Sequence, residues 1–396
     1  MTRIYVLMLT AFVDMLGVAI VFPQVPFYAQ RLHAQTWMIG WIIASFSIAQ
    51  LAASPLWGRI SDRYGRKPVL LVGLSASAIA FVVFAFAQTW WVLLVSRLIQ
   101  GAGGGTTGVV QAYVGDVVAP KDRAKALGWI SAATSSGVAI GPAISSLTVH
   151  LSWEAPGLIA AAICAINVLL TWGLLPESKA GKGKNPPRPS IDAATIRPVR
   201  EVLWDVIRHP RGDVPRLVWV YAVGMLGFNS MNAVLALYLG HEFGVTSETI
   251  GYFFAYVGVL SIVMRALVIG KAVDRLGETG VMRIGAVMLA VGLALMPLPH
   301  TIPLFALVIP LIPISTALLF PATSALVTHR APKAELGQVL GVQQSFGGIA
   351  RVVAPIWATA TFQLAGPSVP FYVASGIVAV VSLLAFRIQP NLAESN

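Results

Sequence analysis

The chain carries little charge and a single cysteine. Of its 396 residues, 57% are hydrophobic and 11% are charged, whereas soluble domains carry about 25% charged residues. So few charges cannot cover the surface of a water-soluble chain of this length, and much of the surface is therefore expected to face lipid. Cys164 stands alone, which excludes an intrachain disulfide.

The sequence also lacks the signatures of hydrolases, kinases and zinc sites. Its six histidines are scattered, and His241 is not followed by a second histidine four residues later, as a helical zinc motif requires. An enzyme is therefore the least supported class, and we expect neither a metal nor a cofactor.

Long apolar runs fill the chain instead. A membrane-spanning helix needs about 20 mostly apolar residues, and the sequence accommodates twelve such segments. The first six are 4–29, 38–58, 68–88, 91–116, 123–149 and 154–175, and the second six are 215–240, 249–270, 280–298, 302–328, 334–363 and 368–387. The expected fold class is therefore an all-α integral membrane protein with twelve transmembrane helices.

The net charge of +11 does not indicate a nucleic-acid partner, because the basic residues lie in alternate loops. The opposite loops hold only Arg31. Lysine and arginine are retained on the cytoplasmic side of membrane proteins, so we expect both termini to be cytoplasmic. The compactness of the chain favours a bacterial inner membrane.

A short motif occurs twice. Residues 58–65 and 270–277 both read G-x-x-x-D-R-x-G, 212 residues apart, and the Ala-Pro-Lys segments 119–121 and 331–333 have the same offset. Two matches at one offset predict two copies of one unit. We expect a six-helix bundle over 1–175, a cytoplasmic linker over 176–213 and a second six-helix bundle over 214–396.

The linker has two parts. Residues 179–189 are rich in lysine, glycine and proline and predict a flexible tether. Apolar residues then recur at helical spacing over 196–207 with arginines between them, which predicts a short amphipathic helix on the inner membrane surface. The alternative is a regulatory or partner site.

Twelve spans, the 6+6 repeat and a long central loop resemble the major facilitator superfamily. The loop at 58–67 resembles the family signature between helices 2 and 3, and Arg97 to Gly101 resembles the R-x-x-Q-G pattern of helix 4. The resemblance covers nearly the whole chain. It implies two pseudo-symmetric six-helix bundles that rock about a central cavity.

Two further motifs narrow the resemblance to drug:proton antiporters, including tetracycline exporters. Residues 137–142 resemble the G-x-x-x-G-P antiporter motif of helix 5, and Asp14 with Pro23 and Pro26 resembles the helix 1 motif. The helix 5 segment departs from the pattern at Ser145-Ser146, where the family often has two glycines. The second loop copy also lacks the Arg-Lys pair that follows the first.

The resemblance implies that the loop motif forms a cytoplasmic gate, and the residue types are physically suited to that role. Asp62 can cap the N-terminus of a helix in the other half, where free N–H groups favour an anion, and Arg63 can pair with Asp116. The alternative is that these charges only set topology. The expected gate residues are Gly58, Asp62, Arg63, Gly65, Arg66, Asp116, Asp274 and Arg275.

Asp14 and Arg97 are the expected proton-coupling pair. Asp14 lies about ten residues into the first span, about 15 Å deep, and ionisable groups at such depth are costly and usually functional. Burial favours the neutral acid and a nearby arginine favours the carboxylate, so a change of surroundings can load and release a proton. The alternative is a static ion pair that fixes helix packing.

A substrate cavity is expected between the halves, lined by apolar and aromatic groups with a few amides. Its candidate residues are Gln24, Tyr28, Gln50, Gln111, Asn229, Asn232, Tyr256, Arg265, Gln343 and Arg351. Each is equally well explained as an interhelical hydrogen bond. Gly137, Gly141 and Pro142 are the expected helix 5 hinge, because small residues permit close packing and proline kinks the helix.

The favoured function is proton-coupled export of an amphipathic, drug-like small molecule by a monomer. Arg265 and Arg351 have no acidic partner in the second half of the sequence, so a carrier of an anionic metabolite or lipid is the alternative. A more remote one is a membrane sensor or scaffold that does not transport.

Overall fold

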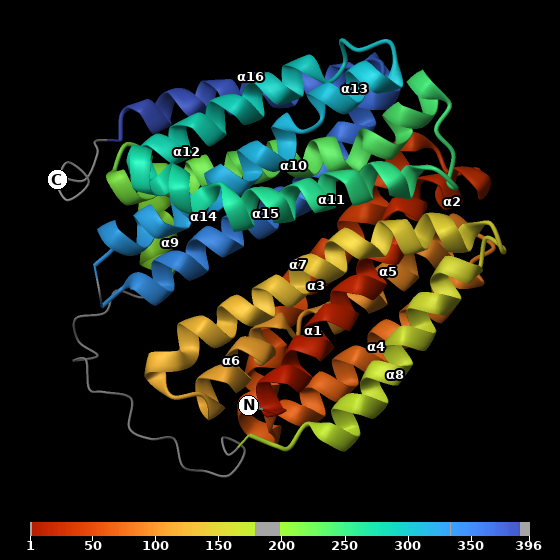
Figure 1. Cartoon of the computed structure of the whole chain (residues 1–396), viewed down its shortest axis with the longest axis horizontal. Coiled ribbons are helices and arrows are strands. Elements are labelled where there is room, and N and C mark those ends of the chain that lie inside the picture. Colours follow the sequence, from red (N-terminus) through yellow and green to blue (C-terminus); the bar gives the residue numbers. More distant parts are fainter. Residues whose placement is uncertain (1, 179–198, 333, 389–396) are drawn as a thin grey trace. The chain divides into compact units, whose positions relative to one another are not determined.

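The computed structural model describes residues 2–178, 199–332 and 334–388, and within them it contains helices and no strands. The predicted flexible tether at 179–189 lies outside the described residues. The first helices are α1 Thr2–Val21, η1 Phe22–Gln24, α2 Val25–Arg31, α3 Thr36–Tyr64, α4 Arg66–Ala85, α5 Trp90–Gly104, α6 Thr107–Val117, η2 Pro120–Asp122, α7 Arg123–Val149 and α8 Ala155–Leu174 (Figure 1). The others are α9 Val199–Arg208, α10 Asp213–Phe243, α11 Ile250–Leu267, α12 Ile269–Leu295, α13 Ile302–Val308, α14 Leu311–Arg330, α15 Leu336–Ala365 and α16 Val369–Phe386.

The helices follow the twelve predicted segments, and ten helical runs of the described residues are long and apolar enough to cross a membrane. Two predicted spans are not among these ten runs. One is the interrupted pair α5–α6, and the other is the helix α15, which carries Arg351 and several glutamines. The all-helical, membrane-spanning class is confirmed.

The predicted fourth span is broken in the middle. Helix α5 ends at Gly104 and α6 begins at Thr107, within a run of glycines. Trp57 Nε1 donates to the carbonyl oxygen of Ala102 at 2.6 Å and Gln50 Nε2 donates to that of Gly104 at 3.2 Å. These side chains satisfy backbone groups that the break leaves without helical partners, as a break at membrane depth requires.

Contacts group the chain into two compact units. Unit 1 comprises Met1–Pro186 with Gly244–Gly258, and unit 2 comprises Pro187–Phe243 with Val259–Asn396. The segment Gly244–Gly258 belongs with unit 1 because Gly251 lies directly on the carbonyl of Pro142 in α7. The boundaries predicted from the sequence stay a prediction.

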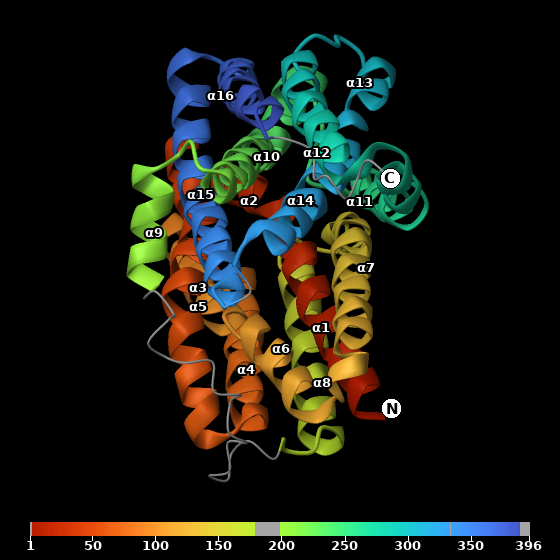
Figure 2. The same cartoon turned by 90° about the vertical axis from the view of Figure 1, so that its left-hand side faces the viewer.

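In unit 1, α1 lies beside α7 in both views of the cartoon (Figures 1 and 2). An added Cβ at Gly137 would lie 3.0 Å from the backbone nitrogen of Leu16, and one at Gly141 would lie 2.8 Å from the carbonyl carbon of Ala19. The missing side chains thus allow the two helices to touch backbone to backbone, the close approach that small residues permit.

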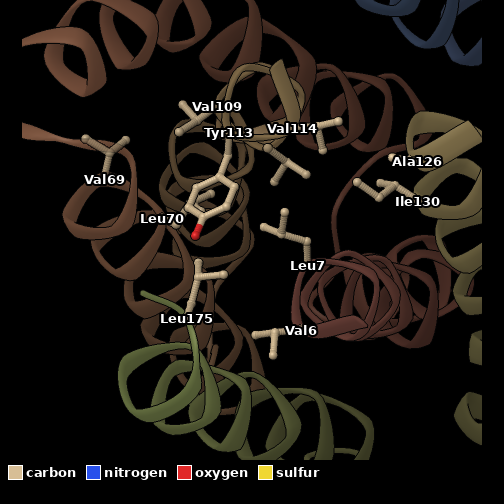
Figure 3. Close-up of a cluster of buried hydrophobic side chains, with 11 residues drawn as sticks. Val6, Leu7, Val69, Leu70, Val109, Tyr113, Val114, Ala126, Ile130 and Leu175 are labelled. Atoms are coloured by element: carbon tan, nitrogen blue, oxygen red, sulfur yellow. The ribbon is translucent and has the colours of Figure 1, made fainter. Parts of the chain in front are cut away.

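A buried apolar cluster holds the ends of several unit 1 helices together (Figure 3). Leu7 of α1 and Leu70 of α4 are 0% and 1% exposed, and Tyr113 of α6 is also fully buried. The Tyr113 hydroxyl donates to the carbonyl oxygen of Pro176 at 2.5 Å. This cluster fixes α6 and the segment after α8 beside the loop at 58–67.

In unit 2, the predicted amphipathic helix is present as α9. The helix lies beside α15 (Figure 2). Val202 and Val206 are buried against α10 and α15, and Trp219 Nε1 donates to the carbonyl oxygen of Val206 at 3.0 Å. Trp204 and Ile207 stay exposed. Part of the apolar face that we expected on lipid therefore packs on protein.

Candidate functional site

The loop motif turns at Gly65, which ends α3 and precedes α4. Its backbone has φ 102° and ψ 160°, a region that is open essentially to glycine alone. Gly277, 212 residues later, has φ 68° and ψ 166°. The two copies of the motif therefore place glycine where the chain makes the same kind of turn, which explains why both keep it.

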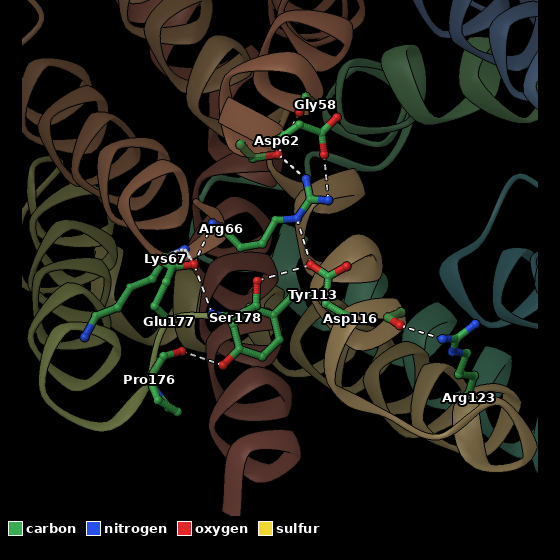
Figure 4. A network of polar contacts seen from close by, with 12 residues as sticks. Gly58, Asp62, Arg66, Lys67, Tyr113, Asp116, Arg123, Pro176, Glu177 and Ser178 are labelled. Atoms are coloured by element: carbon green, nitrogen blue, oxygen red, sulfur yellow. Dashed lines mark hydrogen bonds and ion pairs between the residues drawn. The ribbon is translucent and has the colours of Figure 1, made fainter. Parts of the chain in front are cut away.

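Arg66 is the hub of a polar network beside this turn (Figure 4). Its guanidinium contacts Asp62 Oδ1 at 2.7 Å and Asp116 Oδ2 at 3.1 Å, and it donates to Ser61 Oγ at 2.6 Å. Arg66 is only 8% exposed. A buried arginine that is shared by two carboxylates makes charge-assisted bonds that are stronger than neutral ones.

The partner that we expected for Asp116 was Arg63, and the structure corrects this assignment. Arg63 instead stacks over the ring of Tyr64, 5.4 Å from its centroid. The reason is the turn at Gly65. It starts α4 at Arg66 and directs the Arg66 side chain back across the end of α3 to Asp116. Helix capping by Asp62 from the other half stays a prediction.

Glu177 completes the network, and sequence reasoning missed it. Its carboxylate accepts from the backbone N–H of Arg66 at 2.8 Å and from that of Lys67 at 3.2 Å, which are the free N–H groups of the first turn of α4. Ser178 Oγ donates to Asp116 Oδ2 at 3.1 Å. The sequence held one signal for this contact: Glu177 directly follows the sixth apolar run, and α4 begins without an acidic residue in its first turn.

The second loop copy differs from the first in its charged residues. Neither Asp274 nor Arg275 forms an ion pair among the residues that the structure describes. Glu278 follows Gly277 where Arg66 follows Gly65, and its carboxylate lies 3.6 Å from His329 Nε2. The residue after the turn glycine is therefore an acid in the second copy and a base in the first.

Asp14 and Arg97 are not paired in the structure, contrary to the expected contact. Asp14 is partly exposed in the middle of α1, and its carboxyl has no hydrogen bond or ion pair within residues 2–178, 199–332 and 334–388. Helix α1 packs mainly on α7 and α8, whereas α5, which carries Arg97, packs on α3 and α4. The two side chains therefore have different neighbours.

Arg97 is buried at 2% exposure without an acidic partner among the described residues. It donates to Gln100 Oε1 one turn along α5, and its guanidinium lies 5.0 Å from the ring centroid of Phe46 in α3. Its Nε has no hydrogen-bond partner in the described part. The R-x-x-Q-G pattern thus joins Arg97 to its own glutamine and to an aromatic face.

Two expected cavity residues are buried in unit 1. Gln24 Nε2 donates to Ser145 Oγ and to the carbonyl oxygen of Ser247, both at 2.9 Å, and Tyr28 donates to the carbonyl oxygen of Ala85 at 2.9 Å. They are 2% and 4% exposed. Gln24 and Tyr28 therefore form interhelical hydrogen bonds in this structure, which was the alternative to a role in lining the cavity.

The other expected cavity residues differ in exposure. Gln343 is fully buried, with Nε2 3.5 Å from Ser324 Oγ, and Asn229 Nδ2 donates to the carbonyl oxygen of Met225 at 2.7 Å. The remaining members are partly or fully exposed and are Gln50, Gln111, Asn232, Tyr256, Arg265 and Arg351.

Ser145 and Ser146, which depart from the family pattern, have partners in unit 1. Both are fully buried in α7. Ser145 Oγ accepts the hydrogen bond from Gln24, and Ser146 Oγ accepts one from the backbone N–H of Gly251 at 2.8 Å. The hydroxyls therefore satisfy groups that glycines would leave without these bonds. The hinge role of Gly137, Gly141 and Pro142 stays a prediction.

The fold defines a helical, multi-pass membrane protein. The family model described as Major Facilitator Superfamily matches residues 7–278 and 217–395. The chain therefore belongs to the Major Facilitator Superfamily, whose members carry small molecules, and it is not an enzyme.

Its relatives include efflux proteins. The chain is 26% identical over 388 residues to Multidrug resistance protein 2 of Bacillus subtilis, covering 96% of this chain and 94% of the relative. It is 28% identical over 358 residues to the class C tetracycline resistance protein of Escherichia coli, covering 89% and 88%.

Solved structures share the fold. The D-xylose-proton symporter matches with a TM-score of 0.78 at 16% identity, covering 100% of this chain and 99% of that one. The human organic anion transporter MFSD10 matches with a TM-score of 0.71 at 23% identity, covering 97% and 99%.

Proposed function

We propose that the chain is a proton-coupled antiporter that exports amphipathic, drug-like molecules across a bacterial inner membrane, with both termini in the cytoplasm. The observation that carries the proposal is the similarity to multidrug and tetracycline resistance proteins over nearly the full length of the chain. The one carboxyl in the middle of α1 supports it, because intramembrane acids commonly mark proton relays.

Asp14 is the proposed proton site. Its carboxyl has no counter-ion among the described residues, so the neutral acid avoids the cost of an unpaired charge within the membrane. Water that reaches the partly exposed side chain stabilises the carboxylate instead. Alternation between these surroundings couples proton release to the conformational cycle. Arg97 modulates the cycle through its charge and not through a direct bond to Asp14.

The network around Arg66 is the proposed cytoplasmic gate of the first half. It ties the end of α3 to α6 through Asp62 and Asp116, and the start of α4 to the segment after α8 through Glu177. These four elements thus move as one body when the bundles rock. Gly58, Gly65 and the second-loop residues Asp274 and Arg275 complete the proposed gate.

A second candidate function is export of an anionic metabolite or lipid. Arg265 and Arg351 lie in apolar helices of unit 2, and neither has an acidic partner among the residues that the structure describes. Two unpaired guanidinium groups are suited to a carboxylate or a phosphate. Replacement of either arginine by glutamine is then expected to abolish export of anions while cationic compounds are unaffected.

Accumulation assays test the proposal. Cells with the chain are compared with matched cells without it, over cationic, neutral and anionic amphipathic compounds. We expect lower accumulation of at least one class, and a protonophore that collapses the proton gradient is expected to remove the difference. Equal accumulation in both cell types for every compound contradicts export, and export that survives the protonophore contradicts proton coupling.

A further inference from the structure

Helix α8 lies against the face of α1 that carries Asp14. Thr10, Asp14 and Gly17 follow one another at four and three residues, so they share one face of the helix. Thr10 Oγ1 lies 3.1 Å from Thr171 Oγ1, and a side chain at Gly17 would begin 3.1 Å from Sγ of Cys164. Asp14 therefore lies on α1 between two points that both contact α8.

Asn167 is the polar side chain of α8 at this level, and it is 1% exposed. Its Nδ2 donates to the carbonyl oxygen of Thr10 at 3.1 Å. In an α-helix this carbonyl also accepts the N–H of the residue four positions later, which is Asp14. The amide of Asn167 is therefore held beside the backbone of Asp14, and the Asp14 side chain tilts toward the same turn.

The other end of the amide is unpaired. Asn167 Oδ1 is buried and has no hydrogen-bond partner in the described part of the chain. The orientation of the amide is not ambiguous, because a carbonyl oxygen only accepts and the group that bonds Thr10 must be the NH₂. A buried acceptor without a donor costs free energy, so a donor is expected in some state of the protein.

We propose that Asn167 is a positioning residue for the proton carrier, whose Oδ1 accepts a hydrogen bond from the protonated carboxyl of Asp14. This inference rests on the proposed proton-coupled function. A carboxylic acid can donate to the amide oxygen, whereas a carboxylate cannot, since both groups are then acceptors. Asn167 thereby favours the proton-loaded acid, whereas the carboxylate gains no bond from Asn167 Oδ1.

Few other titratable groups face this point. Cys164 is the one titratable side chain of α8. Those of α4 and α7 lie in their first turns and are Arg66, Lys67, Arg123 and Lys125, those of α6 are Tyr113 and Asp116, and η1 has none. Among the described residues, Asn167 Oδ1 is a buried neutral acceptor on α8 that has no hydrogen-bond partner.

Infrared titration of the purified full chain in lipid nanodiscs tests the proposal. The band of the protonated Asp14 carboxyl is identified as the one lost in Asp14→Asn, and its intensity is followed against pH. Asn167→Leu removes the acceptor, which destabilises only the protonated form. We expect the midpoint to fall by about 0.5 to 1 pH unit, as loss of one ordinary hydrogen bond implies, and the band frequency to shift.

The matched control is Thr171→Val, which removes the neighbouring contact to Thr10 and is expected to leave midpoint and band unchanged. Asn167→Ala is a second variant in case Asn167→Leu does not fold, and it must move the midpoint in the same direction. An unchanged midpoint in a folded Asn167 variant overturns the inference, as does an equal shift in Thr171→Val. Absence of any protonated Asp14 band over the stable pH range overturns the proton-site function itself.

Discussion

Replacement of Gly65 by alanine is expected to destabilise unit 1 and to disable the gate. At φ 102° and ψ 160° the backbone is in a region that costs a non-glycine residue about 1–3 kcal/mol. An added Cβ would also lie 2.9 Å from the carboxyl carbon of Glu177. That carboxylate must move away, which removes its bonds to the N–H groups of Arg66 and Lys67.

The loss of these charge-assisted bonds adds about 1–3 kcal/mol, so the total cost is about 2–6 kcal/mol. The matched control is Gly128→Ala in α7, outside the gate, because an added Cβ there meets nothing within 4 Å. Both variants are measured by thermal unfolding in detergent and by export from cells. A Gly65→Ala protein that unfolds at the wild-type temperature and exports normally refutes the reasoning.

Two further substitutions separate the assignments made from the structure. Arg66→Lys loses the planar group that reaches two carboxylates and Ser61 at once, and it is expected to lower the export rate at least about tenfold, as loss of about 1.4 kcal/mol implies. The control Arg63→Lys is expected to export normally. Equal effects in the two variants contradict the corrected pairing. Gly141→Ala places a methyl group 2.8 Å from the carbonyl carbon of Ala19 and is expected to lower the free energy of unfolding by about 1–3 kcal/mol. Gly128→Ala in the same helix meets nothing within 4 Å and is expected to leave that free energy unchanged. Unfolding curves of the two proteins check this.

The membrane-spanning segments could be predicted closely from the sequence, because hydropathy over about 20 residues responds to the thickness of the bilayer. The loop repeat could also be recognised from the sequence, because both copies keep a glycine at the turn. Gly65 and Gly277 both occupy a backbone region that other residues avoid. The interruption between α5 and α6 was not predicted. It depends on Trp57 and Gln50 of another helix, whose donors satisfy the freed carbonyls.

Side-chain partners were harder to predict than helices. Arg63 and Arg66 are both plausible partners of Asp116 from composition, and only the turn at Gly65 decides between them. Gln24 was expected to line a cavity, but polar residues in membrane helices serve packing and binding alike, and its direction depends on where Ser145 and Ser247 lie. Glu177 was missed because its partners are backbone N–H groups, which a sequence does not distinguish.

Transport in proteoliposomes under an imposed pH gradient tests the central claim most directly, with wild type and Asp14→Asn compared on the same compound. The account predicts that wild type moves the compound uphill only when the gradient is present, and that Asp14→Asn loses uphill movement but retains downhill exchange. Normal uphill transport by Asp14→Asn would contradict the assignment of Asp14 as the proton site.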